Sequence, residues 1–134
     1  MKRKDVRAAV GLADTSLFIA LEQARSLSGD PPERVQISVV TLGELRLGVL
    51  AADDVATRAR RLRTFTHAMS LSPLPVGDAV ADAWATLRLA LRDAGRRMPL
   101  NDSWIAATAL AHRLPIVAQD SDYDGVPGLT VIQV

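Results

Sequence analysis

The sequence predicts an α/β fold in which a mostly parallel central sheet lies between two layers of helices. Short apolar or β-branched runs alternate with longer segments whose apolar residues recur every three to four positions, as strands followed by helices do. The clearest such run, 8–13, is continuously apolar, as expected for a strand buried on both faces. Glycine, proline and aspartate mark the turns between segments. Together these observations favour a three-layer α/β/α sandwich.

Composition limits the classes of protein to which the chain can belong. Its 134 residues are expected to form one domain, 1–134, with a core that needs no disulfide support, and it contains no cysteine. The lack of cysteine excludes thiolate chemistry and agrees with a cytoplasmic protein. Residues 1–5 resemble the charged start of a signal peptide, but the apolar run that follows is too short, and no run could span a membrane. The net charge of +1 excludes nucleic-acid binding by bulk charge.

The first half of the chain predicts two strand–helix units. The apolar run 8–13 forms a strand, and a helix begins after Asp14 at its carboxyl end. After a proline-rich loop, the β-branched run 35–40 forms a second strand. Thr41 is expected to cap the next helix, and the spacing of Thr41 and Glu44 matches a capping box.

The second half predicts three helices and two further strands. Residue types that start or end helices and strands mark each segment. We expect one helix from Asp53 to about Ser70, a second from Gly77 to near Gly95 and a third capped by Asn101. We expect the strands over 114–118 and 129–134. Trp84 and Trp104 lie among apolar helical positions and are expected to make core or dimer contacts.

Asp102 is the acid around which the functional interpretation is built. Pro99 interrupts the preceding segment, so Asp102 falls in the first turn of a helix, where the helix dipole favours a carboxylate. Helical spacing places Asp102 on the same side as Ile105 and Ala109, which face the core. A carboxylate there needs a cation, a donor or a metal, because burying it unpaired costs several kcal/mol. Alternatively, Asp102 only stabilises the start of its helix.

Three further acids are expected at the same edge of the sheet as Asp102. Asp14 and Asp120 directly follow strands, and Glu44 lies early in the helix after another strand. In open parallel sheets, ligands bind beyond the carboxyl ends of the strands. Each acid also has an ordinary explanation as a helix cap or a turn residue, so the argument rests on their joint placement. Clustered carboxylates without cysteine or histidine favour a hard cation, Mg²⁺ or Mn²⁺, and hence phosphate chemistry.

Small residues around the acids fit the same hypothesis. The hydroxyl groups of Thr15 and Ser16 are candidates for orienting a water molecule or binding a phosphate. Gly48, one helical turn beyond Glu44, leaves space beside that carboxylate. The arginines at 88, 92 and 96 follow helical spacing, which most often means a solvated face, and contact with an RNA backbone is the alternative.

The ordered blocks 12–16, 38–48, 100–109 and 116–131 resemble PIN-domain ribonucleases, specifically the toxins (VapC) of VapBC toxin–antitoxin modules. The resemblance implies magnesium-dependent cleavage of RNA, with manganese as a substitute, and a homodimer neutralised by a VapB-like antitoxin. It implies the catalytic acids Asp14, Glu44, Asp102 and Asp120, of which Asp14, Asp102 and Asp120 would bind metal. Asp122 competes with Asp120 for the role of fourth acid or assists in positioning substrate or water.

Two departures and two rival functions accompany the resemblance. Ala118 stands where many members have a hydroxyl residue, and Gln119 stands where many have a basic one. A phosphoacceptor domain on a similar sheet would need a late lysine, and this chain has none after Lys4. The second rival is a catalytically silent PIN-like module that acts only by binding an antitoxin-type partner.

Overall fold

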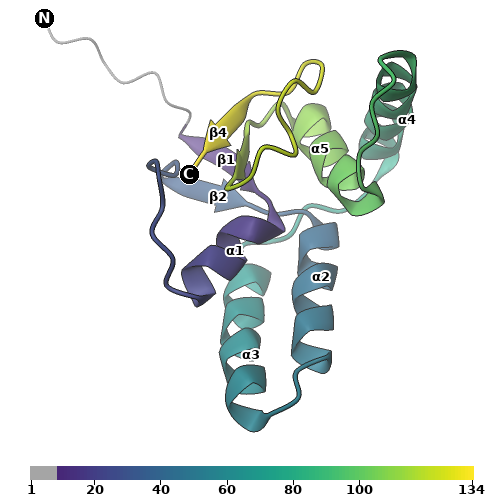
Figure 1. The fold of residues 1–134 in the computed structure, drawn as a ribbon. Coiled ribbons are helices and arrows are strands. Elements are labelled where there is room, and N and C mark those ends of the chain that lie inside the picture. Colours follow the sequence, from purple (N-terminus) through teal and green to yellow (C-terminus); the bar gives the residue numbers. More distant parts are fainter. Residues whose placement is uncertain (1–8) are drawn as a thin grey trace, which may run out of the picture.

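Four parallel strands form one sheet in the computed structural model, which describes residues 9–134 (Figure 1). The strands are β1 (Val10–Ala13), β2 (Arg34–Gln36), β3 (Ile116–Ala118) and β4 (Val131–Gln133). Their order across the sheet is β2-β1-β3-β4, and every neighbouring pair is parallel. Parallel pairing brings the carboxyl ends of β1 and β3 to the same edge, with Ala13 opposite Val117. The predicted parallel sheet is confirmed.

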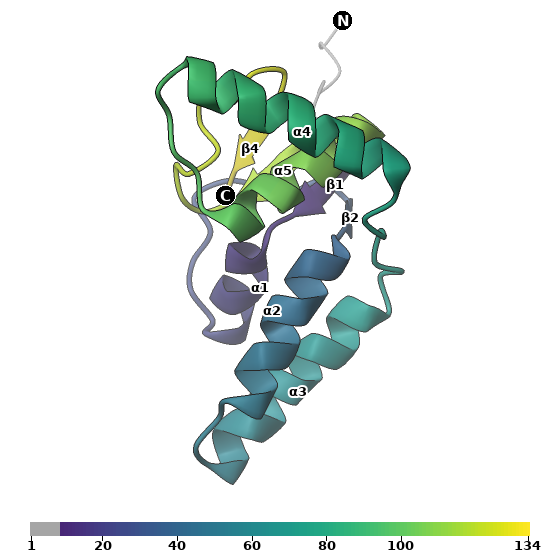
Figure 2. The same ribbon diagram turned by 90° about the vertical axis from the view of Figure 1, so that its right-hand side faces the viewer.

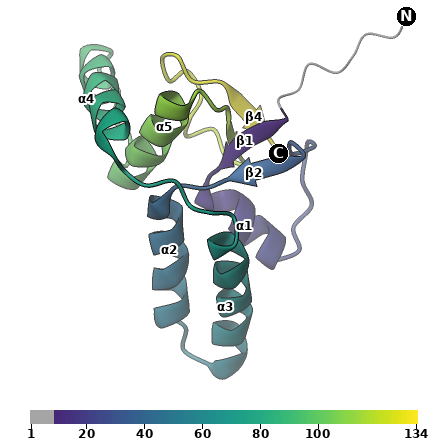
Figure 3. The ribbon, with the colours of Figure 1, turned by 180° about the vertical axis from the view of Figure 1, so that it is seen from behind.

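Five helices connect and cover the strands. They are α1 (Thr15–Glu22), α2 (Val39–Leu50), α3 (Val55–Met69), α4 (Asp78–Asp93) and α5 (Leu100–His112). α4 and α5 pack together over one side of the sheet (Figure 2). α2 and α3 lie side by side and project away from the sheet (Figures 1 and 3).

The two central strands are buried on both faces, and alternate residues point to opposite layers. Leu12 and Ile116 belong to one apolar cluster with residues of α4 and α5. Ala13 and Val117 belong to a second cluster with residues of α1, α2 and α3. This alternation follows from the two-residue period of a strand. The three-layer arrangement predicted from the apolar runs is therefore present.

α4 and α5 meet through the two tryptophans of the chain. The rings of Trp84 and Trp104 are stacked, with centroids 4.3 Å apart and an interplanar angle of 3°. The Trp84 indole N–H also donates to Ser103 Oγ at 3.0 Å. The two tryptophans therefore pack on each other between α4 and α5, and both stay partly exposed outside the apolar clusters.

The predicted start of α2 is wrong by three residues. Ser38, not Thr41, is the N-cap, and its side chain accepts a hydrogen bond from the Val40 N–H. The preceding strand ends at Gln36 instead of continuing to Val40. Serine and threonine are both good caps, so composition alone does not choose between them. Because Thr41 lies inside the helix, Glu44 belongs to no capping box and its carboxylate is available for other contacts.

The predicted cap of α5 is also wrong. Pro99 occupies the N-cap position, and Asn101 is the second helical residue. Proline at this boundary has no N–H to satisfy and its φ of −53° suits the entry into a helix. Asp102 remains in the first turn, as predicted.

Two expectations concern membranes and export. No helix within residues 9–134 combines the length and apolar character needed to cross a bilayer. The charged start at 1–5, which was compared with a signal peptide, lies outside the described residues.

Candidate active site

Asp14 joins the end of β1 to the start of α1 and lies beside the end of β3. Its backbone N–H donates to the Val117 carbonyl at 3.0 Å, which continues the β1–β3 pairing by one residue. Its side chain is the N-cap of α1, with Oδ1 accepting from the Ser16 N–H at 2.8 Å. Asp14 is only 5% exposed. Asp14 therefore both caps α1 and belongs to the candidate active site.

Ser16 fixes the Asp14 carboxylate and connects it to the loop after β3. Its hydroxyl donates to Asp14 Oδ1 at 2.5 Å and accepts from the Gln119 N–H at 3.2 Å. Burial raises the pKa of Asp14, while the two hydrogen bonds from Ser16 lower it and the charge of Asp120 raises it further. Ser16 thus stabilises the ionised form of a buried acid.

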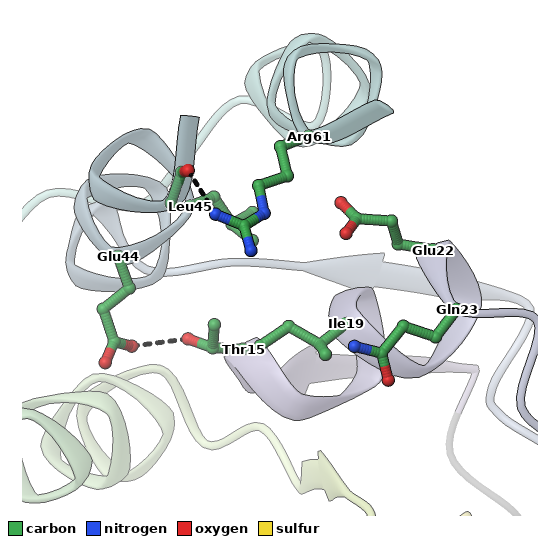
Figure 4. A pocket seen from close by; sticks show the side chains of 8 residues that line it. Thr15, Ile19, Glu22, Gln23, Glu44, Leu45 and Arg61 are labelled. Carbon is green, nitrogen blue, oxygen red and sulfur yellow. Dashed lines mark hydrogen bonds between the residues drawn. The ribbon is translucent and has the colours of Figure 1, made fainter. Parts of the chain in front are cut away.

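Glu44 of α2 is held by one residue from each of two other helices. Thr15 of α1 donates to Glu44 Oε1 at 2.5 Å (Figure 4). The Thr15 hydroxyl also lies 3.2 Å from that of buried Thr41. From α5, the Asn101 amide donates to Glu44 Oε2 at 3.4 Å. The sequence analysis assigned Thr41 and Asn101 to helix caps and therefore missed their place in this network.

Asp102 is the acid most affected by its neighbours. Burial in the first turn of α5 and repulsion by Asp122, Asp14, Glu44 and Asp120, in that order, raise its pKa from 3.8 to about 6. Repulsion of this kind requires the carboxylates to lie close to one another. The structure therefore places Asp14, Glu44, Asp120 and Asp122 around Asp102, at the edge of the sheet where β1 and β3 end, without gathering them into a closed set of metal ligands.

Asp120 and Asp122 lie in one turn and both are exposed. The Asp122 N–H donates to Asp120 Oδ1 at 3.0 Å. Asp120 acts on the pKa of Asp14, whereas Asp122 is the strongest charged neighbour of Asp102. Asp120 also acts on Asp102, so both loop acids lie near the site and either can serve as the fourth acid.

Tyr123 is a site residue that the sequence analysis missed. It is fully buried, and burial and the charge of Asp14 raise its pKa. Its hydroxyl faces the Asp14 carboxyl and lowers the pKa of that group, yet it forms no hydrogen bond of normal geometry within the described residues. The available signal was that the only tyrosine of the chain stands between Asp122 and Asp124.

We expect Tyr123→Phe to stabilise the metal-free protein and to raise the pKa of Asp14 further. The substitution keeps the buried ring and removes a hydroxyl that has no good partner, so the free energy of unfolding should increase by about 1 kcal/mol. Urea unfolding and an NMR titration of the Asp14 carboxyl measure the two effects. A loss of stability would show that the hydroxyl is hydrogen-bonded in solution. Tyr123→Leu, which also removes the ring, is the control for lost packing.

A cavity of about 260 Å³ opens next to the acids, between α1, α2 and α3 (Figure 4). Thr15 and Glu44 form its boundary with the acidic site, and Gly48 lines it farther along α2. A Cβ at position 48 would lie 3.8 Å from the Arg61 side chain, which is ordinary contact. Arg61 is fixed there by donating to the Gly48 carbonyl at 2.8 Å.

The donor atoms of the site suit a divalent cation. Asp14 and Asp102 are acids whose pKa values are raised by burial and by other carboxylates, and a cation would relieve both costs. Within residues 9–134 no three acidic or histidine side chains are already gathered as a ready-made metal site. Mg²⁺ commonly takes one or two carboxylates and completes its shell with water, so this set of oxygen donors fits it.

Residues 12–129 match the profile of the PIN domain. The chain belongs to the PIN-domain family. The matched range contains the end of β1, all of β2 and β3, the five helices and every acid described above. The four-stranded parallel sheet with its five helices agrees with the fold of this family.

Curated relatives of the same family come from Mycobacterium tuberculosis. Ribonuclease VapC4 is 49% identical over 128 residues, which cover 92% of this chain and 95% of the relative. Ribonuclease VapC5 is 45% identical over 127 residues, covering 94% of each chain. A crystal structure of VapBC-5, a member of the VapBC family of toxin–antitoxin systems, superimposes with a TM-score of 0.85 at 44% identity. That superposition covers 95% of this chain and 100% of the other.

Proposed function

We propose that this PIN-domain protein is a magnesium-dependent endoribonuclease and the toxin of a type II toxin–antitoxin pair. The observation that carries the proposal is the grouping of Asp14, Glu44 and the loop acids around Asp102, whose pKa burial and then repulsion by these carboxylates raise to about 6. Relatives named ribonucleases, at 45% and 49% identity over most of the chain, support RNA as the substrate. Mn²⁺ is the natural substitute for Mg²⁺ at oxygen ligands.

Asp14, Asp102 and Asp120 would hold the ion, with Asp122 as the alternative fourth acid. When bound, Mg²⁺ lowers the pKa of a water molecule and stabilises charge on the phosphate oxygens during an in-line displacement. Ser16 favours the ionised form of Asp14 and fixes its orientation through two hydrogen bonds. Thr15 and Asn101 hold Glu44 at the border of the site, where its carboxylate can accept a proton from an attacking water.

A VapB-like antitoxin is the proposed protein partner, and a homodimer is the proposed assembly. The structure with a TM-score of 0.85 belongs to a VapBC toxin–antitoxin system, which supports a partner of that kind. The proposed place of action is the cytoplasm, where RNA substrates are found.

The decisive experiment incubates the purified chain, free of any partner, with a labelled RNA. We expect cleavage with Mg²⁺ or Mn²⁺, none with EDTA, and recovery when Mg²⁺ is added in excess over EDTA. Cleavage that persists in EDTA would overturn the metal dependence. Failure to cleave any RNA in Mg²⁺, together with binding to an antitoxin, would identify the chain as a silent binding module.

A further inference from the structure

Four arginines surround a hollow on the protein surface where α4 ends. The hollow has a volume of about 580 Å³ and is lined by Arg88, Arg92, Arg96 and Arg97 together with Leu91, Gly95 and Met98. We call these four arginines the arginine cluster. Asp93 is the only acid of the segment that carries them, 88–97. The proposed reaction uses none of the four.

The arginine cluster lies next to the acidic site. Arg96 donates to the Asp122 carbonyl at 3.1 Å, which ties the cluster to the loop that carries Asp120 and Asp122. Arg97 lies on the segment between α4 and α5, five residues before Asp102. The cluster therefore borders both segments that deliver acids to the site.

Two of the four guanidinium groups are available for a ligand. Arg88 is engaged by the Met98 carbonyl at 3.4 Å and lies over the Trp84 ring, and Arg96 is engaged by Asp122. Arg92 contacts only its neighbour Asp93, at 3.3 Å, and both side chains are highly exposed, so this ion pair is weak. Arg97 is exposed and has no hydrogen-bond or ion-pair partner among the described residues.

We propose that the arginine cluster binds the phosphodiester backbone of a single-stranded RNA beside the cleavage site, which rests on the function proposed above. Guanidinium groups match phosphate oxygens in two-pronged geometry. An acidic site repels a polyanion, and a protein with a net charge of only +1 attracts RNA weakly as a whole. Cations placed directly beside the acids offset that repulsion where the strand must lie. Arg92 and Arg97 supply the phosphate contacts.

The test measures binding of a fluorescein-labelled single-stranded RNA by anisotropy, in EDTA, over a range of salt concentrations. Each phosphate contact to a single strand contributes about 0.7 to the slope of log K against log salt concentration. The Arg92→Gln/Arg97→Gln double variant should therefore reduce the slope by roughly 1.4 and weaken binding about tenfold at low salt. Asp93→Asn should tighten binding, because it removes the acid that competes for Arg92.

The matched control is the Arg25→Gln/Arg63→Gln double variant, which removes two exposed arginines near α1 and on α3, away from α4. It should leave the slope within 0.3 of the wild-type value, well under a single phosphate contact. Equal slopes for the Arg92/Arg97 variant and the wild type would overturn the proposal. If that variant instead lost affinity for an acidic antitoxin peptide alone, the cluster would be a protein-binding surface and the proposal would also fail.

The same preparations separate this inference from the proposed function. Binding with the expected slopes but no cleavage after Mg²⁺ is added would support the arginine cluster and overturn the ribonuclease proposal. Cleavage with unchanged slopes would support the ribonuclease and overturn the cluster. Circular dichroism of each variant, matching that of the wild type, shows that the substitutions leave the fold intact.

Discussion

Asp102→Asn is expected to abolish RNA cleavage while making the metal-free protein more stable at neutral pH. The substitution removes a proposed metal ligand, so the rate should fall at least about 100-fold. It also removes a charge that folding forces into a partly buried, acidic environment. Because Asp102 is partly exposed and screened by solvent, the gain in free energy of unfolding should be about 1 kcal/mol at pH 7. Labelled-RNA cleavage and urea unfolding measure the two effects.

The pH dependence of stability tests whether the gain in stability of Asp102→Asn comes from removing the Asp102 charge. The pKa of Asp102 is about 6 in the folded protein and 3.8 for an unperturbed side chain. Between these values the folded state binds more protons than the unfolded state, so stability should fall as the pH rises from about 4 to about 6. Asp102→Asn should flatten this fall. An Asp102→Asn protein that is less stable than the wild type at pH 7 would contradict the explanation.

A matched control distinguishes loss of the site from loss of a helix cap. Asp54 is the N-cap of α3, with its carboxylate accepting from the Thr57 N–H at 2.8 Å, and it is not among the acids that act on Asp102. Asp54→Asn makes the same chemical change as Asp14→Asn at another cap. We expect full cleavage by Asp54→Asn and none by Asp14→Asn. Full activity in both Asp14→Asn and Asp102→Asn would refute the proposed site.

Mg²⁺ is expected to raise the thermal stability of the wild-type protein at pH 7.5. A ligand that binds only the folded state stabilises it by about 2.7 kcal/mol when its free concentration is 100 times Kd. The bound ion would also reduce the repulsion among the carboxylates, which destabilises the metal-free protein. Thermal unfolding followed by circular dichroism, with and without Mg²⁺, measures the rise in Tm.

The effect of Mg²⁺ should weaken below pH 6. Protons compete with the cation for Asp102, whose pKa is about 6, so the rise in Tm should be smaller at pH 5 than at pH 7.5. Sodium chloride at matched ionic strength controls for general screening. Asp102→Asn should show little response to Mg²⁺ at either pH. A rise of the same size in wild type and Asp102→Asn would locate the ion elsewhere.

The fold and the placement of the acids were predictable because both depend on local patterns. Asp14 after an apolar run and Asp102 in a first helical turn follow from residue types within a few positions. The meeting of Asp14 and Asp120 then follows from parallel pairing, since Ala13 is paired with Val117 and each strand ends at that edge. Local pattern and sheet geometry therefore suffice to bring acids together that are about a hundred residues apart in the chain.

Contacts between helices were not predictable in this way. Thr41 and Asn101 have good capping chemistry, but Ser38 and Pro99 take the cap positions, and the two residues instead support Thr15 and Glu44. The Asn101–Glu44 contact joins residues 57 positions apart and depends on how α2 and α5 are oriented. The burial of Tyr123 near Asp14 could not be predicted from local sequence either, because it depends on the path of the whole loop after β3.

The stacked indoles of α4 and α5 give the protein a built-in optical probe. Trp84 and Trp104 are the only tryptophans in the chain, so ultraviolet emission excited at long wavelength originates from this single pair. Ser103, which accepts the hydrogen bond from Trp84, directly follows Asp102, and Trp104 comes next, which places the signal beside the acids. A change in this emission therefore indicates a change in how α4 and α5 pack beside the proposed active site. Helices α2 and α3 contain no tryptophan and do not contribute to the signal.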